Sequence, residues 1–222
     1  PQHRKDRYPT LEEIVPRRIA AHQANRRRGS TRVFPVHRID RDTSGLLLFA
    51  RNDATQQRLI AQFAKHDVER VYLAVVAGRP GARTIASMLV RDRGDGLRGS
   101  SEDLERGRRA ITHIRPLESL SDYTLLECRL ETGRTHQIRI HLAELGHPVC
   151  GDGIYRGPLG SEPIVDSSHP PRLALHATRL GFAHPGSGER LQFESPLPPD
   201  LERFVSRLRG DGCSGAIEST GD

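Results

Sequence analysis

The sequence predicts an α+β protein built around a mixed sheet. Short apolar runs, bounded by Gly, Pro, Asp or Ser, have the length of buried strands. Segments with the apolar period of a helix lie between these runs at irregular intervals. A doubly wound parallel sheet would need regular β-α-β alternation, and a solenoid would need an internal repeat, and the sequence has neither.

The expected elements follow from these patterns in chain order. The apolar runs typical of strands occupy residues 33–36, 46–50, 71–76, 110–114, 123–130, 173–175 and 191–193. The helical patterns occupy residues 11–19, interrupted by Pro16, then 53–64 after a capping Asn52 or Asp53, 135–145 and 201–208. Residues 91–109 are rich in glycine and charge, so we expect a mobile loop there.

Three regions are expected along the chain. Residues 1–32 form a basic N-terminal segment, residues 33–208 form the main folded domain, and residues 209–222 form a polar tail. The sequence begins at Pro1 and not at Met, so whether a segment or domain precedes it is an open question. No apolar stretch approaches the ~20 residues of a membrane span, and no signal peptide is visible.

The charge balance indicates a polyanionic partner. The chain has 34 Lys+Arg against 28 Asp+Glu, which gives a formal net charge of +6, and only Lys5 and Lys65 are lysines. The planar fork of arginine matches phosphate oxygens in pairs better than the point charge of lysine does. A GC-rich genome also favours arginine codons and is the simpler explanation of the bias. The charge therefore makes a polyanion a plausible partner without identifying it.

Cysteine use and motif spacing exclude several kinds of site. The cysteines Cys128, Cys150 and Cys213 are far apart, which argues against zinc and fits a reducing compartment. The spacing of Asp40, Asp42 and Ser44 imitates the start of a calcium loop, but Arg51 stands where such a loop needs a glutamate. The chain also lacks the P-loop, GxGxxG, HExxH and GxSxG patterns. These patterns give no support to a zinc, calcium, nucleoside triphosphate or dinucleotide site.

Two charged clusters remain, HRIDRDTSG at 37–45 and ETGRTHQIRIH at 131–141. Aspartate and serine are common in solvated turns, so structural roles are the default for the first cluster. An aspartate kept ionised by a neighbouring arginine could instead act as a nucleophile. The second cluster places Arg134, His136 and Arg139 around a helix N-terminus, which favours anions. Together the clusters favour one shared site for a polyanion over two unrelated turns.

The chain resembles the RluA-type RNA pseudouridine synthases from Val36 to Pro198. The stretches that carry the resemblance are HRIDRDTSGLLLFARN, ERVYLAVVAG, LETGRTHQIRIHLAELGHPVCGD and RLALHATRLGFAHPGSGERLQFESPLP. The resemblance implies the pseudouridine synthase fold, with a mainly antiparallel sheet, flanking helices and a central active-site cleft. It also implies isomerisation of uridine to pseudouridine in RNA without cofactor or metal.

The same resemblance assigns the site residues. Asp40 is the expected catalytic carboxylate, and Asp42 occupies a structural spacer position. Arg38 is expected to enter the RNA helix in place of the flipped base, and Tyr72 to stack on the target base. Arg139 is expected to form a salt bridge with the catalytic aspartate.

Arg134 and His136 lie in the second motif, and the segment before HRxD departs from the family pattern. Arg134 and His136 are expected to shape the turn, with RNA contact as a second possibility. Family members usually carry an N-K-P-x-G turn before HRxD, and some carry an S4-like RNA-binding domain, but residues 1–36 contain neither. This departure questions the completeness of the sheet more than the chemistry.

The expected function is that of a cytoplasmic, monomeric RNA pseudouridine synthase, with ribosomal RNA favoured over tRNA as the substrate. The first alternative is a non-catalytic RNA-binding protein with the same fold. A low aromatic content of 5%, without tryptophan, argues against a stacking platform for single strands. A glycosidase is a weaker alternative, because the sequence shows no pair of acidic residues suitably spaced for a cleft.

Overall fold

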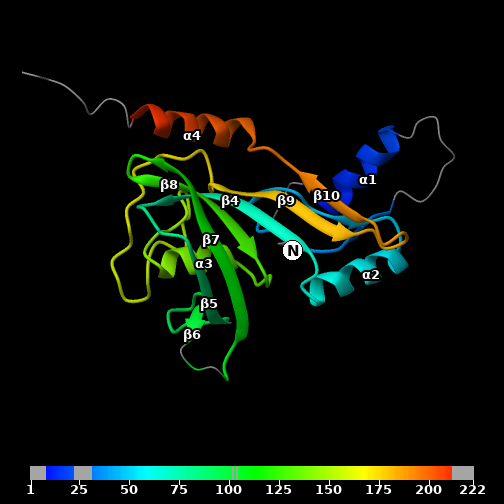
Figure 1. Cartoon of the computed structure of the whole chain (residues 1–222), viewed down its shortest axis with the longest axis horizontal. Helices are drawn as coiled ribbons and strands as arrows, with labels where there is room; N and C mark the ends of the chain where they lie inside the picture. The colour runs from blue at the N-terminus through cyan, green and yellow to red at the C-terminus, as the bar shows by residue number, and fades with distance from the viewer. Residues whose placement is uncertain (1–8, 23–31, 102, 104, 212–222) are drawn as a thin grey trace, which may run out of the picture. The chain divides into compact units, whose positions relative to one another are not determined.

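The computed structural model describes residues 9–22, 32–101, 103 and 105–211 (Figure 1). Parts of the expected basic segment, 1–8 and 23–31, and of the polar tail, 212–222, lie outside the described residues. The described helices are α1 (Leu11–His22), α2 (Asp53–Ala64), α3 (Gln137–Glu144) and α4 (Pro199–Asp211). The strands are β1 (Phe34–Pro35), β2 (Ser44–Gly45), β3 (Phe49–Ala50), β4 (Glu69–Ala77), β5 (Arg83–Val90), β6 (Gly99–Ser101), β7 (Arg108–Leu120), β8 (Tyr123–Leu130), β9 (Leu175–Ala183) and β10 (Arg190–Glu194).

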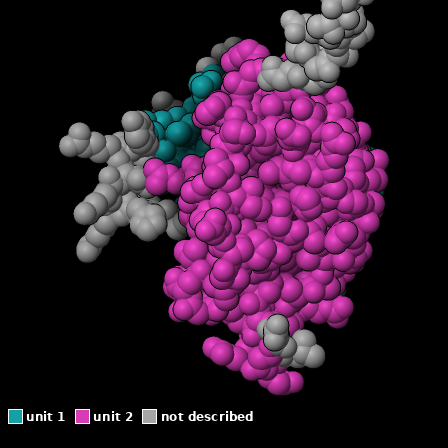
Figure 2. Space-filling model, turned by 90° about the vertical axis from the view of Figure 1, so that its left-hand side faces the viewer, with its two compact units in different colours: residues 1–38, 47–68, 182–191 teal, residues 39–46, 69–181, 192–222 magenta. Residues whose placement is uncertain are grey.

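The chain divides into two compact units, coloured separately in Figure 2. One unit contains residues 1–38, 47–68 and 182–191, and the other contains 39–46, 69–181 and 192–222. In the first unit, α2 packs on the small antiparallel pair of β1 and β3. Asn52 caps α2 by accepting a hydrogen bond from the Thr55 amide at 2.8 Å.

The second unit is organised by a large mixed sheet whose strands run in the order β10-β9-β4-β8-β7-β5-β6. The pairings among strands β4 to β9 are antiparallel, and β2 adds a short parallel pairing with β9. The sheet is therefore mixed and mainly antiparallel, as the sequence predicts. Helix α3 packs against β6 and β7, and α4 packs against β7 (Figure 1).

The main core of this unit lies where the apolar faces of β4, β8 and α3 meet. Strand β4 pairs with β8 and β9 on its two edges, and its residues are buried along most of its length. The side chains of Val76, Leu126 and Leu142 are fully buried in this core. Seven consecutive residues of α3, from Gln137 to Ala143, are buried, so the polar groups of this helix have protein partners and not solvent.

Several sequence-based boundaries were wrong. The apolar run 46–50 is not one buried strand: Ser44–Gly45 pairs with β9, Phe49–Ala50 pairs with β1, and only Ala50 in the run is buried. Composition alone does not show that the chain leaves one sheet and enters another within five residues. The strand expected at 173–175 extends instead from Leu175 to Ala183.

The first helix and the charged segment 91–109 also differ from the expectation. Pro16 does not interrupt α1, and the Thr10 amide and hydroxyl both donate to Glu13 at the start of that helix. The segment 91–109 contains β6 and the first residues of β7, so it belongs to the sheet. Three of its glycines, Gly94, Gly96 and Gly107, occupy tight turns at positive φ between the strands.

Candidate active site

The turn that carries Asp40 is fastened to β9. The Thr43 amide donates to the Asp40 carbonyl at 3.2 Å, which closes the turn. Ser44 then pairs in register with His176, and its hydroxyl lies 2.8 Å from His176 Nδ1. The Leu46 amide donates to the Ala177 carbonyl at 2.9 Å. These contacts fix the position of the Asp40 carboxylate relative to the sheet.

Gly45 allows the turn to approach β9 this closely. Its φ is +109°, and an added Cβ would lie 2.2 Å from the Ala177 carbonyl oxygen. No L side chain fits both restrictions, because the space is filled by backbone and the conformation is strained. The TSG sequence after Asp40 therefore has a structural explanation.

Arg139 extends from α3 and is held mainly by Asp152. Its Nε and Nη2 donate to the two Asp152 carboxylate oxygens at 2.7 and 2.8 Å. The third nitrogen, Nη1, lies 3.6 Å from Asp40 Oδ2. Burial opposes the charge on Arg139, but the hydrogen bonds and charge of Asp152 outweigh it and raise the pKa of the guanidinium. Arg139 is therefore a fixed cation beside Asp40.

Asp152 is itself held by a short turn after α3. Its Oδ1 also accepts hydrogen bonds from the amides of Ile154 and Tyr155 at 2.9 and 3.0 Å. Only 1% of the Asp152 side chain is exposed. Because both carboxylate oxygens are occupied, Asp152 orients Arg139 and leaves one guanidinium nitrogen for Asp40.

His136 and Tyr155 form a second contact to the same region. His136 has a left-handed backbone, with φ +59° and ψ 18°, immediately before α3. Its Nδ1 lies 2.8 Å from the Tyr155 hydroxyl, and its Nε2 lies 3.9 Å from Asp40 Oδ1. The Tyr155 ring also lies 5.1 Å from the Arg139 guanidinium carbon, in cation–π geometry. One aromatic ring thus contacts both groups that approach Asp40.

The pKa of His136 is lowered, mainly because burial disfavours the charged ring. The Asp40 charge opposes this shift, and the charges of Arg139 and Arg98 reinforce it. His136 is therefore neutral at pH 7 and can donate or accept a hydrogen bond without forming an ion pair.

Tyr72 lies on β4 directly opposite Ala177, the β9 residue on which Gly45 packs. The pairing of β4 with β9 shifts register between Val71 and Tyr72. Burial raises the pKa of Tyr72 to about 12, the Arg70 charge opposes the shift and the Asp40 charge adds to it. Tyr72 is therefore close enough to Asp40 to respond to its charge, and its hydroxyl stays protonated at neutral pH.

The residues before His136 pack closely on β4 and β7. Gly133 leaves room for Arg70: a Cβ at this position would lie 2.4 Å from Arg70 Nη1. Arg70 Nη2 donates to the Glu131 carbonyl at 2.7 Å, and Arg134 Nε donates to the Arg109 carbonyl at 3.1 Å. These contacts agree with a turn-shaping position for Arg134.

The structure brings together Asp40, Tyr72 and Arg139 within one compact unit. Asp40 is partly buried, with 16% of its side chain exposed. Arg38 lies in the other unit, and its side chain is exposed. Within the described part of the chain, no three His, Cys, Asp or Glu side chains form a group that could hold a metal ion.

Sequence reasoning missed Asp152 and Tyr155. Both lie in the GDGIY stretch at 151–155, directly after an apolar Val149–Cys150 pair. Aspartate between two glycines is usual in turns, so only its bidentate contact with Arg139 separates Asp152 from an ordinary turn residue. His136 was expected to shape the turn, and its distance from Asp40 could not be read from its position in the chain.

Comparisons with known proteins point to one family. A family model described as RNA pseudouridylate synthase matches residues 3–144, more than half of the chain. The chain is 42% identical to ribosomal large subunit pseudouridine synthase D of Zymomonas mobilis, and the match covers 81% of this chain and 57% of that protein. It is 45% identical to an uncharacterized RNA pseudouridine synthase of Chloroflexus aurantiacus, over 82% of this chain and 55% of that protein. The chain thus spans little more than half the length of these relatives.

Solved structures show the same fold. Human RNA pseudouridylate synthase domain containing 4 aligns with a TM-score of 0.73 at 21% identity, covering 90% of this chain and 84% of that chain. Human RNA pseudouridylate synthase domain containing 1 aligns with a TM-score of 0.64 at 27% identity, covering 80% of each chain. With the family match, the identities above 40% and this shared mixed sheet, the chain belongs to the RNA pseudouridylate synthase family.

Proposed function

We propose that this chain isomerises uridine to pseudouridine in structured RNA, with Asp40 as the catalytic carboxylate. The observation that carries the proposal is the placement of Asp40. Its side chain is 16% exposed and lies 3.6 Å from the Arg139 guanidinium, in a chain of this family. Large-subunit ribosomal RNA is the proposed substrate, because several relatives at 40–43% identity are named ribosomal large subunit pseudouridine synthase D.

The reaction requires a nucleotide that has left the base stack. The bond between ribose C1′ and uracil N1 breaks, the base turns, and a bond from C1′ to C5 forms. The proton on C5 is lost to solvent and N1 gains one, so the product is an isomer of the substrate. Flipping a nucleotide costs a few kcal/mol of stacking and pairing. Arg38 is proposed to occupy the vacated position in the RNA, and Tyr72 to stack on the extruded base.

Asp40 is proposed to drive the bond exchange in its ionised form. A carboxylate there can attack the sugar carbon, attack the base ring or abstract a sugar proton as the glycosidic bond breaks. Each route needs a carboxylate that carries charge and remains reachable. Arg139 supports the charge, and because Asp152 binds two of the guanidinium nitrogens, Arg139 does not enclose Asp40 in a bidentate pair.

His136 and Tyr72 contribute different polar groups around the carboxylate. The lowered pKa of His136 makes this ring a neutral hydrogen-bonding neighbour near neutral pH. Tyr72 retains its proton because burial raises its pKa to about 12, so the ring offers a flat apolar face and not a base. A ring with an apolar face and a hydroxyl that stays protonated supports stacking as the main role of Tyr72.

A tritium-release assay tests the proposed activity. The substrate is an unmodified large-subunit ribosomal RNA transcript whose uridines carry tritium at C5. Isomerisation releases tritium into water and leaves pseudouridine in the digested RNA. RNA binding without release would support the non-catalytic alternative, and free uracil would indicate a glycosidase.

We also propose that the chain acts as a cytoplasmic monomer without a cofactor. Cys128 and Cys150 are free and buried, which agrees with a reducing compartment. None of the described helices combines the length and apolar character needed to cross a bilayer. Light scattering at assay concentrations tests the monomer, and retention of activity after exhaustive dialysis against a chelator tests the absence of a required metal.

A further inference from the structure

A cleft of about 660 Å³ lies between the β5–β6 hairpin, the start of β7 and the turn before α3. Its charged lining is strongly one-sided and consists of Arg91, Arg98, Arg106, Arg108, Arg134 and a single carboxylate, Asp92. All of these residues belong to the same compact unit as Asp40. We call this feature the arginine cleft.

Arginines outnumber carboxylates five to one in the lining of the arginine cleft. The Asp92 carboxylate accepts hydrogen bonds from the amides of Gly94 and Gly96, at 2.8 and 2.9 Å. Over residues 9–22, 32–101, 103 and 105–211, no ion pair involves the five arginines of the cleft. Like charges gathered without counter-charges repel one another, and an anion with several oxygens relieves that repulsion.

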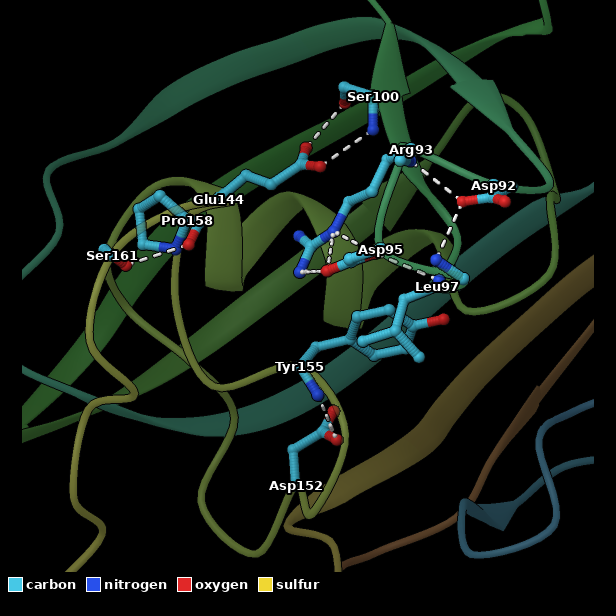
Figure 3. Close-up of polar contacts among 12 residues, drawn as sticks. Asp92, Arg93, Asp95, Leu97, Ser100, Glu144, Asp152, Tyr155, Pro158 and Ser161 are labelled. Carbon is cyan, nitrogen blue, oxygen red and sulfur yellow. Dashed lines mark hydrogen bonds and ion pairs between the residues drawn. The ribbon is translucent and has the colours of Figure 1, made fainter.

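The hairpin that forms one wall of the arginine cleft is tied to α3. The Ser100 amide and hydroxyl both donate to the Glu144 carboxylate, at 2.8 and 2.5 Å, as Figure 3 shows. Ser87 Oγ lies 3.0 Å from His141 Nε2 and 2.8 Å from Ser100 Oγ. Hydrogen bonds from two strands to one helix hold the hairpin in a defined place, so its arginines present a preformed surface.

The tip of the same hairpin is also ordered by its own contacts. Arg93 donates from Nε and Nη2 to Asp95, and the Arg93 amide donates to the Leu97 carbonyl at 2.8 Å (Figure 3). Leu97 packs against the small core cluster that contains Tyr155. The cleft wall and the proposed catalytic centre therefore share a supporting residue.

The arginine cleft opens beside the proposed catalytic centre. Arg134 and Thr135 line it and directly precede His136, whose ring lies 3.9 Å from Asp40. The charge of Arg98 adds to the lowering of the His136 pKa, and it opposes the burial that raises the Tyr155 pKa, so its field reaches both groups. A chain of phosphates seated in the cleft would therefore lead to the position of the flipped nucleotide.

We propose that the arginine cleft binds the phosphodiester backbone of the RNA strand that flanks the target uridine. This inference rests on the proposed function and adds where the substrate strand is held. Arginine forks pair with phosphate oxygens in two-point contacts, and phosphate contacts fix register without reading sequence. Holding the strand beside the target nucleotide also limits the freedom of the backbone that must rotate during flipping.

A triple variant, R91Q/R106Q/R108Q, tests the arginine cleft. All three side chains are exposed, so their loss should leave the fold intact. The probe is the unmodified large-subunit ribosomal RNA transcript. Because each phosphate contact contributes about 0.7 to 0.9 to the salt slope, the slope of log K against log salt should fall by about 2 to 3. KM should rise at least tenfold while kcat changes less than threefold.

The matched control is R203Q, which removes an exposed arginine of α4 outside the arginine cleft. Its salt slope and KM should equal those of the unchanged chain, as should the thermal unfolding midpoints of both variants. Hydroxyl-radical footprinting should show protected riboses next to the target uridine, and the triple variant should lose this protection. An unchanged salt slope and KM in the triple variant would overturn the inference.

The test separates this inference from the proposed function. If the unchanged chain forms pseudouridine but the triple variant binds RNA with the original salt slope, the function stands and the arginine cleft is not a backbone site. If no protein forms pseudouridine but the triple variant alone loses salt-dependent binding, the cleft assignment stands for an RNA-binding protein and the proposed catalysis fails.

Discussion

Arg139 binds Asp152 through two hydrogen bonds of 2.7 and 2.8 Å, and this pair is almost fully buried. The remaining guanidinium nitrogen lies 3.6 Å from Asp40. The cation beside the proposed catalytic carboxylate is thus positioned by a different carboxylate. This relationship predicts that Asp152 affects both stability and activity without touching the substrate.

Asp152→Asn should cost about 3 kcal/mol of unfolding free energy, because it leaves a buried guanidinium without its charged partner. Arg139 would then be free to turn towards Asp40 and enclose its carboxylate, so kcat should fall at least tenfold. Urea unfolding and single-turnover tritium release measure the two effects.

Asp200→Asn is the matched control for Asp152→Asn. Asp200 also accepts two hydrogen bonds from one arginine, Arg172, but the two side chains are 35% and 27% exposed. A solvated pair contributes at most about 1 kcal/mol, so this variant should lose little stability and no activity. Equal stability losses in the two variants would show that burial of the Arg139 pair is not what matters.

Tyr72→Phe should retain most activity, because the ring is proposed to act by stacking and the raised pKa of about 12 keeps the hydroxyl from serving as a base. Only a modest rise in KM is expected. Tyr72→Ala removes the ring and should weaken RNA binding by about 1 to 3 kcal/mol. Complete loss of turnover in the phenylalanine variant would assign the hydroxyl a chemical role.

Gly45→Ala should destabilise the chain by more than about 2 kcal/mol and displace the Asp40 turn. The added methyl group would meet the Ala177 carbonyl in a backbone conformation of φ +109°. Gly188→Ala is the control, because φ is +77° there but no atom lies within 4 Å of the added Cβ. That control should cost about 1 kcal/mol from backbone strain alone. Similar losses in both variants would remove the clash with β9 from the explanation.

The free energy of unfolding should decrease as the pH is lowered, because of His141. This side chain is buried between Ser87 and Thr112. Burial lowers the pKa of His141 to about 4, against about 6.5 in the unfolded chain. The unfolded state therefore binds more protons below pH 6.5, and the stabilising contribution is lost as pH falls towards 4. Between pH 7 and pH 5 the expected loss is about 2 kcal/mol.

Urea unfolding of the unchanged chain and of His141→Gln at both pH values isolates this contribution. The variant should be less stable at pH 7, and the difference between the two proteins should narrow at pH 5. A constant difference across the range would mean that His141 titrates normally in the folded chain.

The sequence predicted the sheet well where one apolar run makes one strand. Strand β4 and strand β8 were located closely because each is mostly buried and is bounded by turns. The run at 46–50 failed because its residues divide between two sheets, and hydrophobicity does not encode a pairing partner. Only one of the eight residues of β5 is buried and its composition is mixed, so its pairing with β7 could not be read from the sequence.

In the candidate site too, some residues could be recognised from the sequence and others only from the fold. The motifs around Asp40 and Arg139 were recognisable because each is a dense, ordered cluster within a few residues. Asp152 lies 13 residues after Arg139, in a stretch that reads as an ordinary turn, and only the fold brings its carboxylate to the guanidinium. The left-handed conformation of His136 was equally hidden, since the sequence favoured a helix that begins at Thr135.

The measurement that tests the central claim most directly is tritium release by Asp40→Asn. Asparagine matches the shape of the carboxylate but cannot carry its charge, so the fold should persist and RNA binding should change less than threefold. Release of tritium and formation of pseudouridine should fall below detection, even in a single turnover with excess enzyme. Turnover by Asp40→Asn at the rate of the unchanged chain would contradict the assignment of Asp40 as the catalytic carboxylate.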